Sequence, residues 1–116
     1  MIELKEWWDV EYKILPEEDI KYSKVVLFTI KNHSPKIRKF KIGVKSVQLK
    51  NELNILKVKM FLDVYQSPLV VEIGKYKKEE IGIAIPKLSI PEDDGKIVFY
   101  IRNEDTKEEK EIPIYL

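Results

Sequence analysis

The sequence predicts an all-β protein in which two antiparallel sheets, with seven or eight strands in all, pack face to face. Apolar and polar residues alternate with a period of two along most of the chain, as they do in half-buried strands. Clusters of Gly, Pro, Asn and Asp recur about every ten residues, which is the spacing of turns in sandwiches and barrels. With 116 residues and no linker or repeat, residues 1–116 are expected to form one β-sandwich domain.

The first strand is expected at residues 8–14, ended by Pro16 and the acids that follow it. Its inward-facing side chains would be Trp8, Val10, Tyr12 and Ile14. Residues 25–30 form a short apolar run rich in β-branched side chains. We therefore expect a central strand there, covered on both faces.

A turn is expected at "NHSP", residues 32–35, because Asn tolerates left-handed geometry and the residue before proline avoids the helical region. In the strand that follows, apolar and lysine side chains alternate. The apolar positions are Phe40, Ile42 and Val44, and the lysines are Lys39, Lys41 and Lys45. The pleat of a half-buried strand places these lysines on its solvent face.

The alternation continues after a second turn at residues 51–54. Leu56, Val58, Met60, Leu62 and Val64 would point inward from a strand over residues 56–64, with Lys57, Lys59, Phe61 and Tyr65 on its outer face. Further strands are expected at residues 69–73, 81–85, 97–101 and 112–116. The segment "YKKEEIGIAI" has acids that suit a helix start, but Gly82 and the alternating isoleucines favour a strand.

Charge is distributed unevenly along the chain, although the net charge is only +1. Residues 1–20 hold seven acids and two lysines, residues 21–78 hold fourteen bases and three acids, and residues 79–116 hold ten acids and five bases. The first explanation is that the terminal strands lie beside the middle strands and their surface charges pair. The second is a charge-polarised molecule that docks an anionic partner or its own neighbour.

Chemistry-bearing motifs are scarce. Cysteine is absent, which removes disulfides and thiolate chemistry, and His33 is the only histidine. Ser34 and Ser67 precede prolines in turns, no glycine-rich phosphate loop occurs, and the clustered acids are typical of solvated loops. We therefore predict no catalytic residue, no metal site and no cofactor.

Two surfaces are candidate binding sites. Five lysines could form one positive surface with two interleaved aromatic groups, and such a surface could bind nucleic acid or another polyanion. These residues are Lys39, Lys41, Lys45, Lys57, Lys59, Phe61 and Tyr65. Trp7 should point outward, opposite Trp8, where it could serve as a platform for a carbohydrate or a partner protein. Outward lysines also protect sheet edges, which needs no partner.

Two stretches resemble immunoglobulin-like modules of prokaryotic proteins, including the glycosidase-associated and cell-adhesion-related families. "VVLFTIKNHSPKIRKFKIGV" resembles their opening strand, turn and second strand, and "IGKYKKEEIGIAIPKLSIPEDDGKIVFYIRNEDTKEEKEIPIYL" resembles their closing half. The resemblance spans residues 24–116 and implies a seven-stranded sandwich used as a spacer, docking or adhesion unit. The long charged strands and the few Ser and Thr residues depart from the usual pattern.

The first expectation for function is thus a non-catalytic protein-interaction or accessory module, whose partner is another protein or a second copy of the chain. A nucleic-acid binder and a carbohydrate-binding module remain as alternatives. No apolar stretch has the length of a signal peptide or a membrane span, so a cytoplasmic location is expected unless the chain is a piece of an exported protein. The 35% of charged residues is typical of a heat-adapted source, here a prokaryote or one of its viruses.

Overall fold

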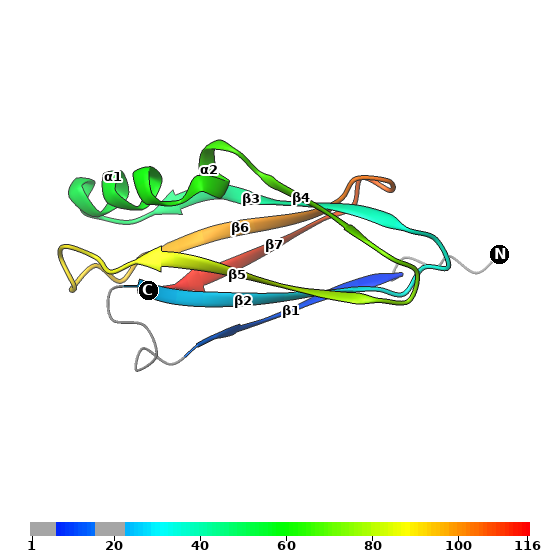
Figure 1. Cartoon of the computed structure of the whole chain (residues 1–116). Coiled ribbons are helices and arrows are strands. Elements are labelled where there is room, and N and C mark those ends of the chain that lie inside the picture. Colours follow the sequence, from blue (N-terminus) through cyan, green and yellow to red (C-terminus); the bar gives the residue numbers. More distant parts are fainter. Residues whose placement is uncertain (1–6, 16–22) are drawn as a thin grey trace.

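The computed structural model describes residues 7–15 and 23–116, and these form two antiparallel sheets packed face to face. One sheet has three strands and the other has four (Figure 1). The first contains, in spatial order, β1 (Trp8–Ile14), β2 (Ser23–Asn32) and β5 (Lys78–Pro86). The second contains β4 (Leu69–Ile73), β3 (Arg38–Gln48), β6 (Lys96–Asn103) and β7 (Glu109–Tyr115). The predicted all-β sandwich is confirmed.

The core lies between the two sheets and is rich in large apolar side chains. Aromatic rings from both sheets meet there: Trp8 of β1 lies 5.3 Å from Phe40 of β3, and Phe28 of β2 lies 5.3 Å from Phe99 of β6, measured between ring centroids. The remaining fully buried positions include Val26, Ile30, Ile42, Ile73, Ile85, Ile97, Ile101 and Ile114. Alternate residues of the strands thus supply the core, as the period of two predicts.

The turn at residues 32–35 and the outward lysines of β3 are both as predicted. Phe40, Ile42 and Val44 are buried, whereas Lys39 and Lys45 are exposed. A bulge between Val44 and Ser46 lets the strand continue with the same face toward the core. The strands predicted over residues 69–73, 81–85 and 97–101 are also present, within β4, β5 and β6, and the strand predicted over residues 112–116 lies within β7 except for Leu116.

The strand predicted over residues 56–64 is wrong. That segment forms α1 (Glu52–Phe61) and the short α2 (Asp63–Gln66), which connect β3 to β4. Leu56 and Met60, predicted to point inward, are exposed, while Val58 and Leu62 are buried. The buried positions 54, 58 and 62 recur every four residues, so they fit a helix as well as they fit every second position of a strand. The segment is also rich in Leu, Lys, Glu and Met, which favour helices.

The first strand is less buried than predicted. Trp8 is buried, but Tyr12 and Ile14 are 49% and 42% exposed. β1 is the edge strand of its sheet, so it has a neighbouring strand on one side only. The expectation of full cover on both faces of β2 also fails, because Val25 and Leu27 on its outer face are only partly buried. Pro16 and its acidic neighbours lie outside the described residues.

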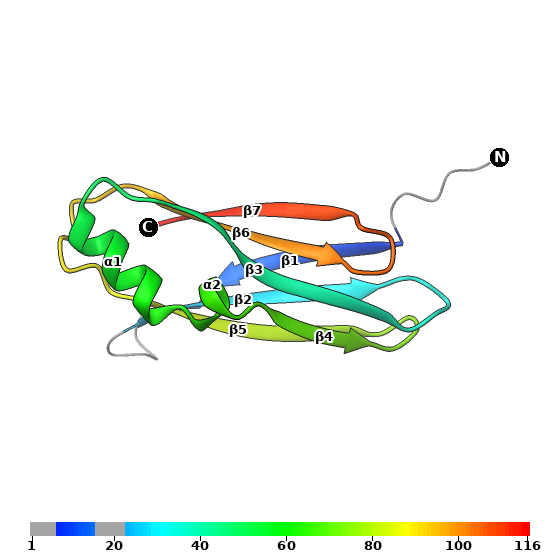
Figure 2. The ribbon, with the colours of Figure 1, turned by 90° about the horizontal axis from the view of Figure 1, so that it is seen from above.

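The sandwich is elongated, and α1 lies at one end of it (Figures 1 and 2). The loop between β5 and β6 reaches the same end, beside α1, and the turn between β2 and β3 lies at the opposite end (Figure 2). Loops and inserted segments at the ends of a rigid sandwich are the usual carriers of binding residues. The end that carries α1 therefore has the features expected of a functional surface.

Candidate protein-docking surface

Helix α1 presents four large apolar side chains to solvent. Leu53, Leu56, Met60 and Phe61, which we call the α1 apolar face, are 63%, 56%, 71% and 49% exposed. They recur at intervals of three, four and one residues and so lie along one side of the helix. Their combined exposed area is roughly 480 Å², because a large side chain offers on the order of 200 Å². A contiguous apolar patch of that size on a small protein is typical of an interaction site.

The local sequence fixes where the helix begins and which side it buries. The Asn51 side chain accepts a hydrogen bond from the backbone N–H of Leu53 at 2.9 Å, which caps the first turn. The helix ends where the N–H of Leu62 donates to the carbonyl of Val58 at 2.9 Å. Val58 and Leu62 join the sandwich core. The apolar face of α1 thus points outward because the core is already served by the other side of the helix.

A buried amide attaches α1 to the loop between β5 and β6. Asn54 is fully buried, and its side chain both accepts from the backbone N–H of Ile90 at 3.0 Å and donates to the carbonyl of Ile90 at 2.9 Å. It also donates to the carboxylate of Asp93 at 3.3 Å. Paired hydrogen bonds to one backbone residue fix the rotation of the helix about its axis as well as its position.

Asp93 holds the other side of this attachment. Its carboxylate accepts from the backbone N–H groups of Lys50, Asn51 and Gly95, at distances between 2.9 and 3.2 Å. These hydrogen bonds, that of Asn51 first, lower the pKa of Asp93 because they favour the ionised form. The carboxylate therefore ties the end of β3, the start of α1 and the start of β6 together. Sequence reasoning assigned it to a solvated acidic loop and missed this role.

Substitution of Asp93 by Asn should destabilise the fold at pH 7 and flatten its acid sensitivity. A carboxyl with a lowered pKa in the folded state contributes stability above its unfolded pKa of about 3.9, and the contribution is lost as the pH falls through the folded value. An amide would also turn its NH₂ toward backbone N–H donors. Urea unfolding between about pH 7 and pH 2 measures this. As the pH falls, the free energy of unfolding should drop more steeply for the wild type than for Asp93→Asn.

The matched control is Asp94→Asn. Asp94 is exposed and pairs with Lys50 at 2.6 Å, and such exposed pairs contribute little. Equal losses of stability at pH 7 for the two variants would contradict the role assigned to Asp93.

A shallow hollow of about 490 Å³ lies along the α1 apolar face. Its lining combines the four residues of that face with Lys57 from the same helix and Ser89 from the loop between β5 and β6. Lys57 supplies the hollow's one ionisable side chain. Within residues 7–15 and 23–116, no carboxylate oxygen lies within 4.0 Å of its amine. The hollow is thus an apolar groove with one cationic group in it.

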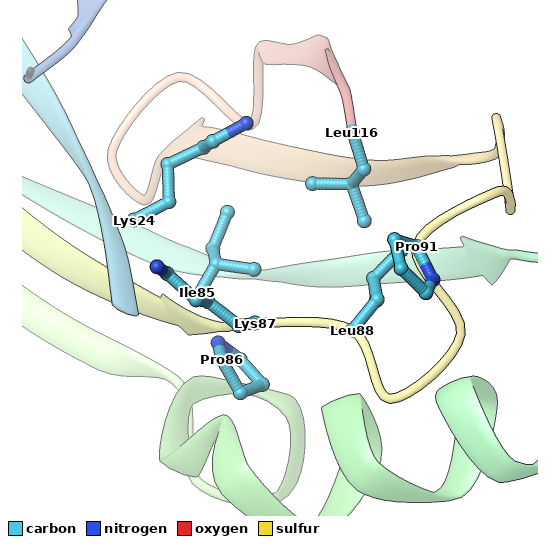
Figure 3. Close-up of a pocket in the computed structure, with 7 residues that line it drawn as sticks. All are labelled: Lys24, Ile85, Pro86, Lys87, Leu88, Pro91 and Leu116. Carbon is cyan, nitrogen blue, oxygen red and sulfur yellow. The ribbon is translucent and has the colours of Figure 1, made fainter. Parts of the chain in front are cut away.

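A second hollow, of about 330 Å³, opens between the two sheets at the same end of the sandwich (Figure 3). Its lining residues come from β2, β5, the loop after β5 and the end of the chain: Lys24, Ile85, Pro86, Lys87, Leu88, Pro91 and Leu116. The ionisable side chains in this lining are two lysines. Figure 3 shows their amines directed apart from each other, so the lining does not assemble an acid–base pair or a nucleophile with its base.

The lysines predicted on β3 are on its outer face, and acidic neighbours engage the amines of two of them, Lys41 and Lys45, whereas Lys39 is exposed. The amine of Lys45 lies 2.9 Å from Glu109 and 2.7 Å from Glu111, both on β7, and these contacts raise its pKa. The amine of Lys41 lies 4.0 Å from Glu104. The explanation of the uneven charge as pairing between terminal and middle strands is confirmed at these positions.

The two other lysines of the predicted positive surface lie elsewhere. Lys57 and Lys59 belong to α1, so the expected surface across neighbouring strands does not form. Lys59 lies over the ring of Tyr65 of α2, 5.5 Å from its centroid. Of the predicted binding residues, only Lys57 and Phe61 meet in the groove. Leu53, Leu56 and Met60 were missed, and the signals for them were the capping Asn51 and the helix-favouring composition after it.

Trp8 is buried and Trp7 is partly exposed, as expected of adjacent residues in an extended segment, and the carbonyl of Trp7 accepts the N–H of His33 at 2.6 Å. The ring of His33 lies 2.8 Å from the carboxylate of Asp9, which fixes the turn onto β1. Among the residues that the structure describes, no three His, Asp or Glu side chains gather in a way that could hold a metal ion. In the same part of the chain, no helix is long and apolar enough to cross a membrane.

Comparison with known proteins adds no relative: the chain matches no protein-family model, and none of the curated proteins matches it. The fold defines its class as a two-sheet all-β sandwich. The α1 apolar face is our candidate binding surface on that sandwich, because it exposes four large apolar side chains beside a hollow.

Proposed function

We propose that this protein is a non-catalytic protein-interaction module, built on an immunoglobulin-like sandwich, and that the α1 apolar face is its docking surface. The single observation that supports this most is the exposure of four large apolar side chains on one side of a firmly held helix. Burying a side chain of this size contributes about 1.5–3 kcal/mol. Four of them give a partner protein enough free energy to offset the cost of association.

The strand order supports the immunoglobulin-like part of the proposal. The third, sixth and seventh strands share one sheet, and the first, second and fifth share the other. Strands C, F and G, and strands A, B and E, are divided in the same way in immunoglobulin domains. The fourth strand here joins the sheet of β3, whereas in the constant-type domain it joins the other sheet.

The rigidity of the helix favours docking over a merely tolerated exposed patch. Asn54 and Asp93 hold α1 through hydrogen bonds to backbone groups. A surface that is already ordered before binding loses little conformational entropy when a partner arrives. Lys41 and Lys45 of β3, by contrast, are engaged by acids of the turn after β6 and of β7, which weakens the case for a polyanion site on this strand.

Photo-crosslinking tests the proposal directly. A p-benzoylphenylalanine placed at Leu56 should form protein adducts in extracts of the source organism, and excess unmodified protein should suppress them. The matched control places the same group at Ile37, which is 58% exposed against 56% for Leu56 but lies in the turn at the far end of the sandwich. Absence of adducts at Leu56, or equal adducts at both positions, would contradict the proposal, as would turnover of a substrate in an activity screen.

A further inference from the structure

We infer that the partner segment is an amphipathic helix that lays its apolar side on the α1 groove and directs a carboxylate at Lys57. This deepens the proposed function and rests on it, because it specifies the chemistry of the segment that docks on the α1 apolar face. Three properties of the groove lead to this partner: its geometry, its charge and its size.

The geometry favours a helix. Leu53, Leu56 and Met60 form a ridge along α1, and ridges of one helix pack into the grooves of another. Helix α1 has 10 residues, so its exposed side is about 15 Å long and faces two to three turns of a second helix. The hollow beside the ridge, bounded by Ser89, gives the apolar side chains of that second helix a place to enter.

The charge requires an acid in the partner. Lys57 lies within the groove lining, so a docked apolar segment would remove water from its amine. A buried charge is costly unless an opposite charge pairs with it. No carboxylate of the described residues lies within 4.0 Å of Lys57, so in this proposal the pairing group comes from the partner. An aspartate or glutamate between the apolar anchors satisfies this requirement.

The size and symmetry of the groove argue against a second copy as the occupant. Its roughly 480 Å² of apolar surface is less than half of the roughly 1,000 Å² or more per partner that obligate homodimers bury. In an antiparallel pairing of two α1 helices, Leu53 would face Met60, but Leu56 would face Lys57 and the two lysines would lie close together at the symmetry axis. That arrangement buries two like charges without acids to pair them.

The test uses an mRNA-displayed library of random 16-residue peptides, selected on the full chain. Enriched peptides should carry apolar residues at helical spacing with Asp or Glu between them. Their affinity, measured by fluorescence anisotropy, should fall about 100-fold for the double variant Leu56→Gln, Met60→Gln, and should be unchanged for Ile37→Gln. Glutamine keeps a high helix propensity, and circular dichroism checks that α1 persists.

Charge reversal tests the ion pair by itself. Lys57→Glu should lower the affinity of an enriched acidic peptide about tenfold. A peptide with Lys in place of its acid should bind the Lys57→Glu variant with the lost affinity restored. Enriched peptides that need the α1 face but are extended or basic would overturn this inference and leave the proposed function standing. Peptides that bind the Gln variants equally well, or a selection without enrichment, would overturn both. A dimer in sedimentation velocity that the double Gln variant abolishes would replace the partner helix by a second copy.

Discussion

Phe99→Ala should lower the free energy of unfolding by about 4 kcal/mol, the usual cost of removing a buried phenyl ring. Phe99 lies at the middle of β6, is fully buried, and meets Phe28 of the opposite sheet edge to face at 5.3 Å between ring centroids. Its removal deletes a contact between the two sheets and leaves a cavity that neighbouring β-branched side chains fill poorly. Urea unfolding followed by circular dichroism measures the loss.

The matched control for this prediction is Phe61→Ala. Phe61 has the same chemistry but is 49% exposed on α1, so its removal should change stability by less than about 1 kcal/mol. It should instead weaken binding at the α1 groove. A loss at Phe61 as large as that at Phe99 would mean that the α1 face belongs to the core rather than to a docking surface.

Gly95→Ala should destabilise the protein by about 3 kcal/mol, through crowding rather than lost contact. A Cβ at Gly95 would lie 2.1 Å from the carbonyl oxygen of Gln48 and 2.8 Å from the Cα of Leu49. Both are backbone atoms of β3 and its end, and Asp93 links this segment to Gly95 by accepting the N–H groups of Lys50 and Gly95. The strand cannot withdraw without breaking the attachment of α1. Thermal unfolding of this variant should show a clear drop in Tm.

Gly82→Ala is the matched control for Gly95. Its Cβ would meet Val25 at 3.6 Å and Leu27 at 4.0 Å, which are ordinary contacts. We expect a change within about 1 kcal/mol, because alanine also reduces the conformational entropy of the unfolded chain. Equal losses in the two variants would show that the crowding at Gly95 is relieved by movement of β3.

The position of α1 depends on the sandwich. The connection between β3 and β4 contains α1, and the loop between β5 and β6 supplies Ile90 and Asp93 that hold it. A partner bound at the α1 groove would thus contact a segment whose position is set by β3, β5 and β6 together. This is the arrangement expected of a binding segment carried by a rigid scaffold.

The sheets followed from the sequence because a strand's side-chain period is a local property. Phe40, Ile42 and Val44 alternate with lysines, and the pleat alone places the first set inward. The turn at Asn32 is local in the same way, because the Asn32 side-chain oxygen accepts the backbone N–H of Ser34, two residues on. Even the pairing of acidic with basic strands could be anticipated, since neighbouring strands in an antiparallel sandwich bring their surface charges within reach.

Tertiary structure decided the rest. The spacing of Val58 and Leu62 fits both a strand and a helix. The helix is held in place by a hydrogen bond from the backbone N–H of Ile90 to the side chain of Asn54, 36 residues away. Asp93 has the sequence context of a solvated loop acid, yet its carboxylate accepts the N–H of Lys50, 43 residues before it. Such partners are brought together only when the two sheets pack, so local signals such as the capping Asn51 can indicate a helix, but they do not determine that its Leu56 and Met60 side turns outward to form the α1 groove.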